Sequence, residues 1–253
     1  MSVLEIEEPE LLKNFRLETP NATWNQLKGN SDVNNALKVN VIKKTGGLCV
    51  YCEQKLIAKT DYQIEHFHPK RGNDNSDFGE GVPNRAIEWE NLYPGCLGGT
   101  AQVAHFSEKQ DIDFRTGANK KNRGRLTCGQ KKGETDPEGV FISPLALNNK
   151  TPIFRYNDAD GSVSINEEAC IAQDISLELA NNHLIRLNLD SQRLRDARFA
   201  LAASLRSEFD KAFNFDAERV GELIDEWLAL DEQGMYTHPF ISLITSKYYT
   251  VND

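Results

Sequence analysis

The spacing of apolar and polar positions changes along the chain, and the first stretch has helical spacing. Val33, Leu37 and Val41 recur every four residues, which places them on one face of a helix. Asp32 stands where the N-cap of that helix is expected, because an aspartate side chain can accept hydrogen bonds from the free N–H groups of a first turn. The pattern predicts a mainly helical N-terminal region over residues 1–48.

The next stretch, residues 49–135, has no long apolar pattern. It is rich in glycine, asparagine, cysteine, histidine and lysine, so few of its residues could build a conventional hydrophobic core. A bound metal ion would explain how so polar a segment folds, because metal–ligand bonds then contribute directly to folding.

Regular patterns return after this stretch. Residues 136–170 predict a connector with a hairpin, because the apolar segments 153–156 and 162–165 flank a turn-forming stretch. Residues 171–253 predict a helical C-terminal region. The expected N-caps of its three helices are Asp174, Asp190 and Asp216. The inward face predicted for the second helix consists of Leu194, Ala197, Leu201, Leu205 and Phe209.

Composition narrows the class of protein. With 253 residues, of which 39% are hydrophobic and 26% charged, the chain is expected to be globular and to bury a sizeable core. No run approaches the roughly 18 apolar residues that indicate a membrane span. The N-terminal sequence lacks the basic and apolar segments of a secretory signal. A cytoplasmic protein that does not engage membranes is therefore expected.

The charge is unevenly distributed. A net charge of −9 makes the chain as a whole a poor non-specific ligand for nucleic acid. Residues 115–133, however, carry seven basic residues and no acidic one. This basic stretch predicts a local phosphate-binding surface, and the alternative is an ordinary solvated loop.

The cysteines indicate a metal site. Disulfides are not expected in a cytoplasmic chain, and four of the five cysteines fall in one third of the sequence. These four are Cys49, Cys52, Cys96 and Cys128. The first two form a Cys-x-x-Cys pair that can face one ion, and the other two complete the four ligands of structural Zn²⁺. Residues 97–127 must then loop out between two ligands, whereas Cys170 is expected to be a small buried apolar residue.

A compact set of catalytic side chains lies within this zinc segment. Glu65 directly precedes His66 at the end of a short predicted strand, and a proline follows. The carboxylate can bind a hard divalent ion such as Mg²⁺, and a histidine with a pKa near neutrality can take a proton from water. Such an ion can clamp a scissile phosphate. The alternatives for His66 are a core histidine or a zinc ligand.

Four motifs carry a resemblance to a known family: CVYCE (49–53), IEHFHPK (64–70), WENLYPGC (89–96) and CGQKKG (128–133). Together they resemble the HNH endonucleases associated with retrons and with the Septu anti-phage system, the PtuB-like proteins. The resemblance extends over most of residues 20–200, with its specific motifs confined to residues 49–133. It implies an α+β fold in which a small ββα-metal (HNH) core with a zinc knuckle is flanked by mainly helical N- and C-terminal regions.

The resemblance also implies a role for each matching residue. His66 matches the general base, and Glu65 matches the carboxylate that holds a catalytic Mg²⁺ or Mn²⁺ ion. Asn91 matches the asparagine that ties down the loop between the strands and keeps the histidine oriented. The four cysteines match structural zinc ligands. The expected substrate contacts are His68, Lys70, Lys120, Lys121, Arg123, Arg125 and Lys132.

Two positions depart from the family pattern. Gly129 stands where the family usually has a metal-binding Asn, Asp or His, so a second ligand would have to come from Asn119, Asn122 or Gln130. His68 stands where the family tends to have arginine; it would serve as a metal ligand or a phosphate contact, or have no role. The metal geometry is therefore the weakest part of the resemblance.

The implied activity is hydrolysis of phosphodiester bonds in nucleic acid, with DNA favoured over RNA, within an anti-phage defence complex. The implied partners are an ABC/SMC-like ATPase (PtuA-like) and, in retron systems, a reverse transcriptase and its DNA. The alternatives are a non-catalytic zinc-stabilised module that binds nucleic acid or protein, and a toxin-like nuclease.

Overall fold

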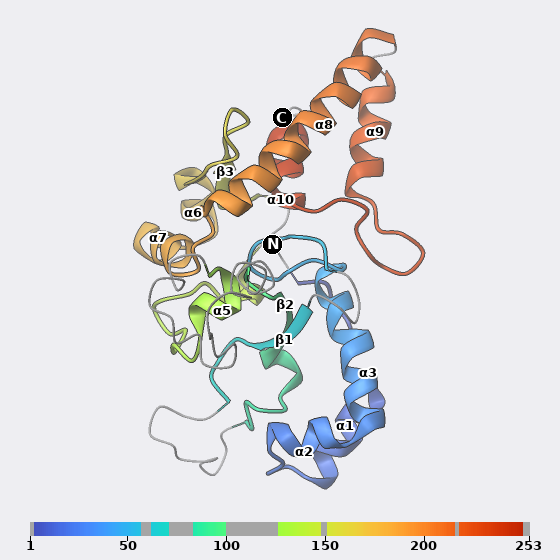
Figure 1. Ribbon diagram of the computed structural model, residues 1–253, viewed down its shortest axis with the longest axis vertical. Helices are drawn as coiled ribbons and strands as arrows, with labels where there is room; N and C mark the ends of the chain where they lie inside the picture. Colours follow the sequence, from blue (N-terminus) through green and yellow to red (C-terminus); the bar gives the residue numbers. More distant parts are fainter. Residues whose placement is uncertain are drawn as a thin grey trace, which may run out of the picture.

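Helices precede and follow two short antiparallel strand pairs in the described chain, an α+β arrangement (Figure 1). A computed structural model describes residues 3–56, 62–70, 83–99, 126–147, 151–215 and 218–249. In chain order the elements are α1 (Glu10–Glu18), α2 (Trp24–Gly29), α3 (Ser31–Val41), the 3-10 helix η1 (Ile42–Thr45), β1 (Tyr62–His66), η2 (Trp89–Asn91), β2 (Leu92–Cys96), α5 (Cys128–Lys132), η4 (Pro144–Ala146), β3 (Phe154–Tyr156), β4 (Val163–Ile165), α6 (Glu167–Ala172), α7 (Leu177–Arg186), α8 (Gln192–Phe215), α9 (Glu218–Leu228), α10 (Ile241–Ile244) and η5 (Thr245–Tyr249).

The predicted N-terminal helix is present as α3, and its buried face is the expected one, formed by Val33, Leu37 and Val41. The expected N-cap Asp32 is wrong, because the helix begins at Ser31, two residues earlier than that expectation allows. The Asn30 side chain caps it by accepting a hydrogen bond from the Val33 N–H, and Asp32 lies in the first turn.

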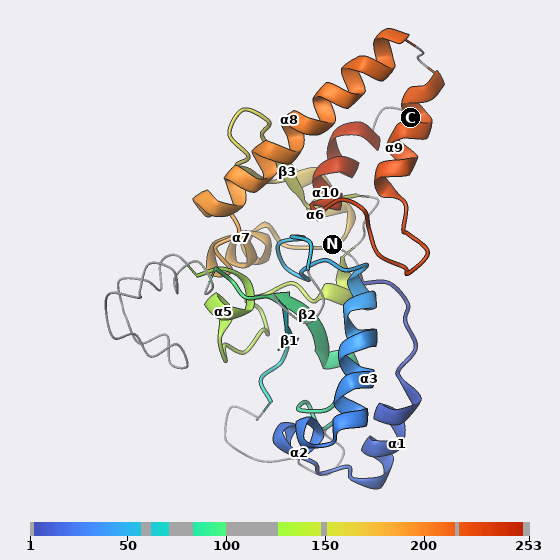
Figure 2. The same ribbon diagram turned by 45° about the vertical axis from the view of Figure 1, so that its right-hand side comes forward.

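The strand pair β1–β2 lies between the N-terminal helices and the C-terminal helices in both views (Figures 1 and 2). The strands are antiparallel, with Glu65 opposite Tyr93 and His66 opposite Leu92. All of β2 is buried, and one cluster of buried residues joins its first residue, Leu92, to α1, α2 and α3. The small sheet is therefore held mainly by packing against its neighbours, since two short strands alone are marginal in water.

The predicted hairpin in the connector is confirmed as β3 paired with β4, each within one residue of its expected bounds. Cys170 follows in α6 and is fully buried, as expected for a small apolar side chain. Its thiol packs with Ile142, Ile153 and Ile175 in a cluster separate from the other cysteines.

The C-terminal region is helical as predicted, but two of its expected N-caps are wrong. Ser176 caps α7, and Asp174 lies in the preceding turn with a positive φ. Asp190 precedes α8 by two residues, and its carboxylate accepts hydrogen bonds from the Val163 N–H and from a nearby guanidinium. The third expected cap, Asp216, lies outside the described residues.

The long helix α8 carries the predicted inward face, with Leu194 and Leu205 fully buried. Arg198 also lies on this face, and its guanidinium donates hydrogen bonds to the carbonyls of Leu189 and Gly161. Within the described ranges, every helix is too short or too polar to cross a membrane.

Hydrogen bonds from the C-terminal region hold the segment that carries Cys49 and Cys52 in place. The buried carboxylate of Glu53 accepts hydrogen bonds from the backbone N–H and the hydroxyl of Ser242, and its carbonyl accepts one from the Phe240 N–H. On the other side, the Cys128 N–H donates to the Leu187 carbonyl at 2.9 Å. Contacts from distant parts of the chain thus fix the cysteine-bearing turns.

One buried histidine makes stability depend on pH. His183 is 3% exposed, its Nδ1 accepts a hydrogen bond from the Ile142 N–H, and burial lowers its pKa to about 3. This pKa lies below the value of about 6.5 in an unfolded chain. The unfolded chain therefore binds the extra proton first, and stability is lost as pH falls from about 6.5 towards 3.

We expect His183→Gln to reduce this pH dependence, because an amide oxygen can accept from Ile142 but does not titrate. The fall in the free energy of unfolding between pH 7 and pH 5 should shrink by about 2 kcal/mol relative to the parent chain. Urea denaturation at the two pH values measures it. His238→Gln, at a half-buried position, is the control and should retain most of the fall. An equal fall in His183→Gln and the parent would contradict the assignment.

Candidate functional site

The four predicted cysteines come together in space. Their sulfur atoms all lie within 4.8 Å of one another, every one of the four residues is buried, and none forms a disulfide. Cys49 and Cys52 lie in the turn after η1, Cys96 ends β2 and Cys128 begins α5. Three segments far apart in sequence therefore meet at this cluster.

The geometry of the cluster fits a zinc ion. Four sulfurs at about 2.3 Å from a tetrahedral ion lie about 3.8 Å from one another, and the Sγ atoms of Cys52 and Cys96 are 3.8 Å apart. Hydrogen bonds from the neighbouring thiols lower the pKa of Cys96, whereas burial raises the pKa of Cys52 and Cys128. A bound cation would favour the thiolate form of these cysteines, because metal ligation needs deprotonated sulfur.

Glu65 and Lys132 form a buried ion pair beside this cluster. The Lys132 ammonium lies 3.2 Å from the Glu65 Oε1 atom, with the two side chains 1% and 10% exposed. The Tyr51 hydroxyl donates to the same carboxylate at 3.4 Å. Burial raises the pKa of Glu65, and the nearby ammonium acts in the opposite direction. Lys132 thus faces inward, which favours a role in positioning Glu65 over the phosphate contact that the resemblance implies.

The departure at Gly129 has a steric reason in this structure. A Cβ atom built on Gly129 would overlap the carboxylate of Glu65. Helix α5 can approach the carboxylate only because this position has no side chain. Of the alternative ligands, Gln130 turns away and donates to the Gln63 side chain at 2.8 Å, whereas Asn119 and Asn122 lie outside the described residues.

His66 is buried and held in one orientation. It is 7% exposed, its ring meets that of Trp24 edge-to-face with the centroids 4.6 Å apart, and its Nε2 lies 3.1 Å from the Ala86 carbonyl oxygen. A carbonyl only accepts, so Nε2 carries the proton and Nδ1 is the acceptor. Burial lowers the pKa to about 3, so the expectation of a near-neutral pKa is wrong for this arrangement.

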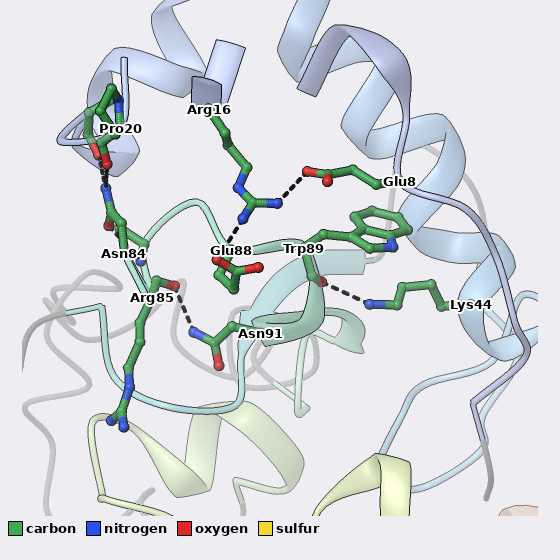
Figure 3. Close-up of polar contacts among 11 residues, drawn as sticks. Glu8, Arg16, Pro20, Lys44, Asn84, Arg85, Glu88, Trp89 and Asn91 are labelled. Atoms are coloured by element: carbon green, nitrogen blue, oxygen red, sulfur yellow. Dashed lines mark hydrogen bonds and ion pairs between the residues drawn. The ribbon is translucent and has the colours of Figure 1, made fainter. Parts of the chain in front are cut away.

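Asn91 ties together the two segments that flank the histidine. Its side-chain amide donates to the carbonyl of Arg85 at 2.6 Å (Figure 3). The amide also donates to the His68 carbonyl at 3.0 Å, and its oxygen accepts from the His68 N–H at 2.7 Å. The side chain is buried, so losing these bonds would leave several backbone groups unpaired. This is the bracing that a loop between two strands needs to hold the end of β1 in place.

Asn84, which the sequence did not single out, positions Ala86, whose carbonyl contacts His66. The Asn84 side chain accepts from the Ala86 N–H at 3.1 Å and donates to the carbonyls of Pro20 and Ala22, both at 2.9 Å (Figure 3). The chain before α2 thereby fixes the carbonyl that His66 contacts. An Asn beside Pro83 resembles ordinary turn chemistry, so no signal in the sequence distinguished it.

Lys44 was also missed. It is 2% exposed and its ammonium donates to the Trp89 carbonyl at 2.8 Å (Figure 3). The ammonium also donates to the Leu92 carbonyl at 3.2 Å. The ammonium lies over the rings of Trp89 and Tyr93, and burial lowers its pKa to about 8. Lys44 therefore pins the start of β2 to η1. Lysine is rarely buried, so sequence alone favours a solvated side chain here.

Of the remaining predicted substrate contacts, His68 and Lys70 are among the described residues. Burial lowers the pKa of His68, and its Nδ1 is buried with no hydrogen-bond partner in the described ranges. Lys70 is exposed, with its ammonium 5.8 Å from the centre of the Trp24 ring. The basic residues predicted to contact substrate in the insertion lie outside the described residues: Lys120, Lys121, Arg123 and Arg125.

The described residues beside His66 do not form a ready binding site for a divalent ion. Glu65 is already paired with an ammonium, and Gly129 contributes no side chain. Among the described residues, the candidate metal-binding group of closely spaced His, Cys, Asp or Glu side chains consists of the four cysteines. The Mg²⁺ or Mn²⁺ ion implied by the resemblance therefore does not fit this arrangement as it stands.

No protein-family model matches the chain. The chain is similar to “Retron Ec83 putative HNH endonuclease” from Escherichia coli, with 28% identity over 211 residues that span 76% of this chain and 74% of the relative. It is also similar to “Septu protein PtuB” from Bacillus thuringiensis, with 30% identity over 184 residues that span 72% of this chain. The chain covers 63% of that protein's length, which is less than two thirds.

These relatives agree with the motifs on which the site is built. The alignments cover about three quarters of the chain. One relative is named as a retron HNH endonuclease and the other as the Septu protein PtuB, the two associations that the motifs in residues 49–133 resemble. The cysteine cluster, with β1, β2 and α5 around it, supplies a structural counterpart to those motifs. The two relatives support the assignment of the chain to an HNH, PtuB-like family.

Proposed function

We propose that the chain is an HNH endonuclease that hydrolyses phosphodiester bonds of nucleic acid, with DNA the favoured substrate. The observation that carries the proposal is the state of His66 at the end of β1. The ring is neutral, its tautomer is set by the Ala86 carbonyl, and it lies next in sequence to Glu65. An endonuclease of a retron is named among the relatives, which supports the same activity.

In this proposal His66 accepts a proton from the attacking water through Nδ1, because Nε2 already donates to Ala86. A base with so low a pKa is weak, but a bound phosphodiester would raise that pKa, because a nearby negative charge favours the imidazolium. Trp24 and Asn91 act as positioning residues, the first by packing on the ring and the second by bracing the backbone that follows it.

We assign a structural role to the cysteine cluster, with Zn²⁺ as its ion. The sulfur spacing and the burial of all four ligands support a closed tetrahedral site, which leaves no open position for substrate. The cluster joins β2, α5 and the turn after η1, so its zinc would hold in place the strand β2 that pairs with the Glu65- and His66-bearing β1. In the same proposal Glu65 would hold a Mg²⁺ or Mn²⁺ ion once it is free of Lys132, and that ion would supply charge stabilisation at the scissile phosphate.

The relatives support an assembly in which the nuclease acts as one part of an anti-phage defence complex. One relative is named for a retron and the other for Septu. We propose an ABC/SMC-like ATPase (PtuA-like) as the partner, and a reverse transcriptase with its DNA where a retron is present. The basic stretch at residues 115–133 is proposed to contact the nucleic-acid backbone.

A second candidate function is a zinc-stabilised binding module without catalysis. The pairing of Glu65 with Lys132, together with the absence of a side chain at Gly129, favours it. Such a module would bind nucleic acid or protein without cutting. A comparison of DNA cleavage by the parent chain and by His66→Ala separates it from the nuclease.

We expect His66→Ala to abolish metal-dependent cleavage of plasmid and single-stranded DNA, with a rate loss of about 10²- to 10⁴-fold, because the general base is removed. Initial cleavage rates with and without Mg²⁺ measure it. His238→Ala, a histidine far along the chain that the mechanism does not use, is the control and should cleave at the parent rate. Cleavage that survives His66→Ala, or a parent chain that never cleaves alone or with its partner, would refute the nuclease proposal.

We expect the purified chain to contain one zinc ion, and Cys96→Ser to lose most of it, because a hydroxyl is a far poorer zinc ligand than a thiolate. Elemental analysis gives the stoichiometry, and thermal denaturation should show a clear drop in stability for the variant. Cys170→Ala is the matched control, since that thiol is buried away from the cluster, and it should keep one zinc ion. Full zinc content in Cys96→Ser would exclude the proposed ligand set.

A further inference from the structure

Lys132 lies where a cation bound to Glu65 would be. Its ammonium donates to the His66 carbonyl at 2.9 Å and to the Gly133 carbonyl at 3.4 Å, and it lies 3.2 Å from Glu65 Oε1. An ammonium has three donors, and each of them has an acceptor here. The side chain is 1% exposed, so it has exchanged its hydration for these three contacts.

The two carboxylate oxygens of Glu65 have different surroundings in this arrangement. Oε1 receives Lys132 and the Tyr51 hydroxyl, and Oε2 lies against the backbone of α5 at Gly129. A divalent ion added beside the pair would meet an ammonium within a few ångströms in a buried environment, where repulsion between like charges is strong. The chain's own cation and a metal ion therefore exclude one another at this carboxylate.

We propose that Lys132 is a resident counter-ion of Glu65, and that a divalent metal ion binds this carboxylate only after the Lys132 ammonium has left it. The inference rests on the proposed function, in which Glu65 is the carboxylate for the catalytic ion. A Lys132 side chain that has left Glu65 becomes available to a phosphate group, which would reconcile its burial with the substrate contact implied by the family.

The test measures Mn²⁺ binding to the full-length, zinc-loaded chain, with free Mn²⁺ followed by electron paramagnetic resonance. Lys132→Met removes the competing charge and leaves Glu65 as an unpaired carboxylate, so the Kd for Mn²⁺ should fall at least tenfold. Lys131→Met is the matched control, because it removes the same charge from the next, exposed position of α5. Its Kd should stay within about twofold of the parent value, the scale of a surface charge effect.

Two further variants keep the result decisive. Lys132→Gln removes the charge but can still donate to the His66 carbonyl, and should also tighten Mn²⁺ binding; zinc content and circular dichroism establish that each variant is folded. Adding Glu65→Gln to Lys132→Met should abolish the gain. A Kd in the folded Lys132 variants that equals or exceeds the parent value overturns the inference, as does a gain that survives Glu65→Gln. These outcomes leave the nuclease proposal intact, since that proposal is decided by cleavage in His66→Ala.

Discussion

Four buried cysteine sulfurs within 4.8 Å of one another are the constraint on which the rest of this structure depends. They join the turn after η1, the end of β2 and the start of α5, and each of these segments is then gripped by the C-terminal region or by the N-terminal helices. Several buried thiolates need a compensating positive charge, so a bound cation would stabilise this cluster and the segments that it joins. The local backbone also reflects this demand: Cys128 has a positive φ, an uncommon conformation for a residue with a side chain.

The region around β1 and β2 is held by buried polar side chains as much as by apolar packing. Lys44, Asn91 and Lys132 each donate to backbone carbonyl groups that are distant in sequence and lie near the ends of these strands. Hydrogen bonds to a charged donor contribute more than neutral ones, and removing such a donor leaves buried carbonyls unpaired. The three side chains thus add to the apolar packing that Phe67, Trp89 and Leu92 provide around these strands.

The charges of the candidate site are balanced internally. Glu65 is matched by Lys132, and His66 is neutral because burial disfavours its protonation. The immediate surroundings of His66 therefore add little to the net charge of −9 carried by the chain. A polyanionic substrate and a divalent ion would each disturb this balance, and they would do so in opposite directions at Lys132 and Glu65. The site is consequently sensitive to the charge of whatever binds next to it.

The sequence by itself determined the parts of this protein that depend on residue type and order. The Cys-x-x-Cys pair and two later cysteines specified one metal cluster, because zinc ligation needs particular side chains and tolerates long insertions between them. Helical spacing gave the buried faces of α3 and α8, since a local pattern determines which residues share a face.

The tertiary structure decided whatever depends on neighbours that are distant along the chain. His66 has a low pKa because Trp24 and Ala86 bury it, and neither residue is near it in sequence. Lys132 faces inward because the Glu65 carboxylate and the His66 carbonyl lie within reach, and Gly129 is required because that carboxylate lies against the backbone of α5. Burial and pairing set the electrostatic behaviour of ionisable groups, and neither can be read from local spacing.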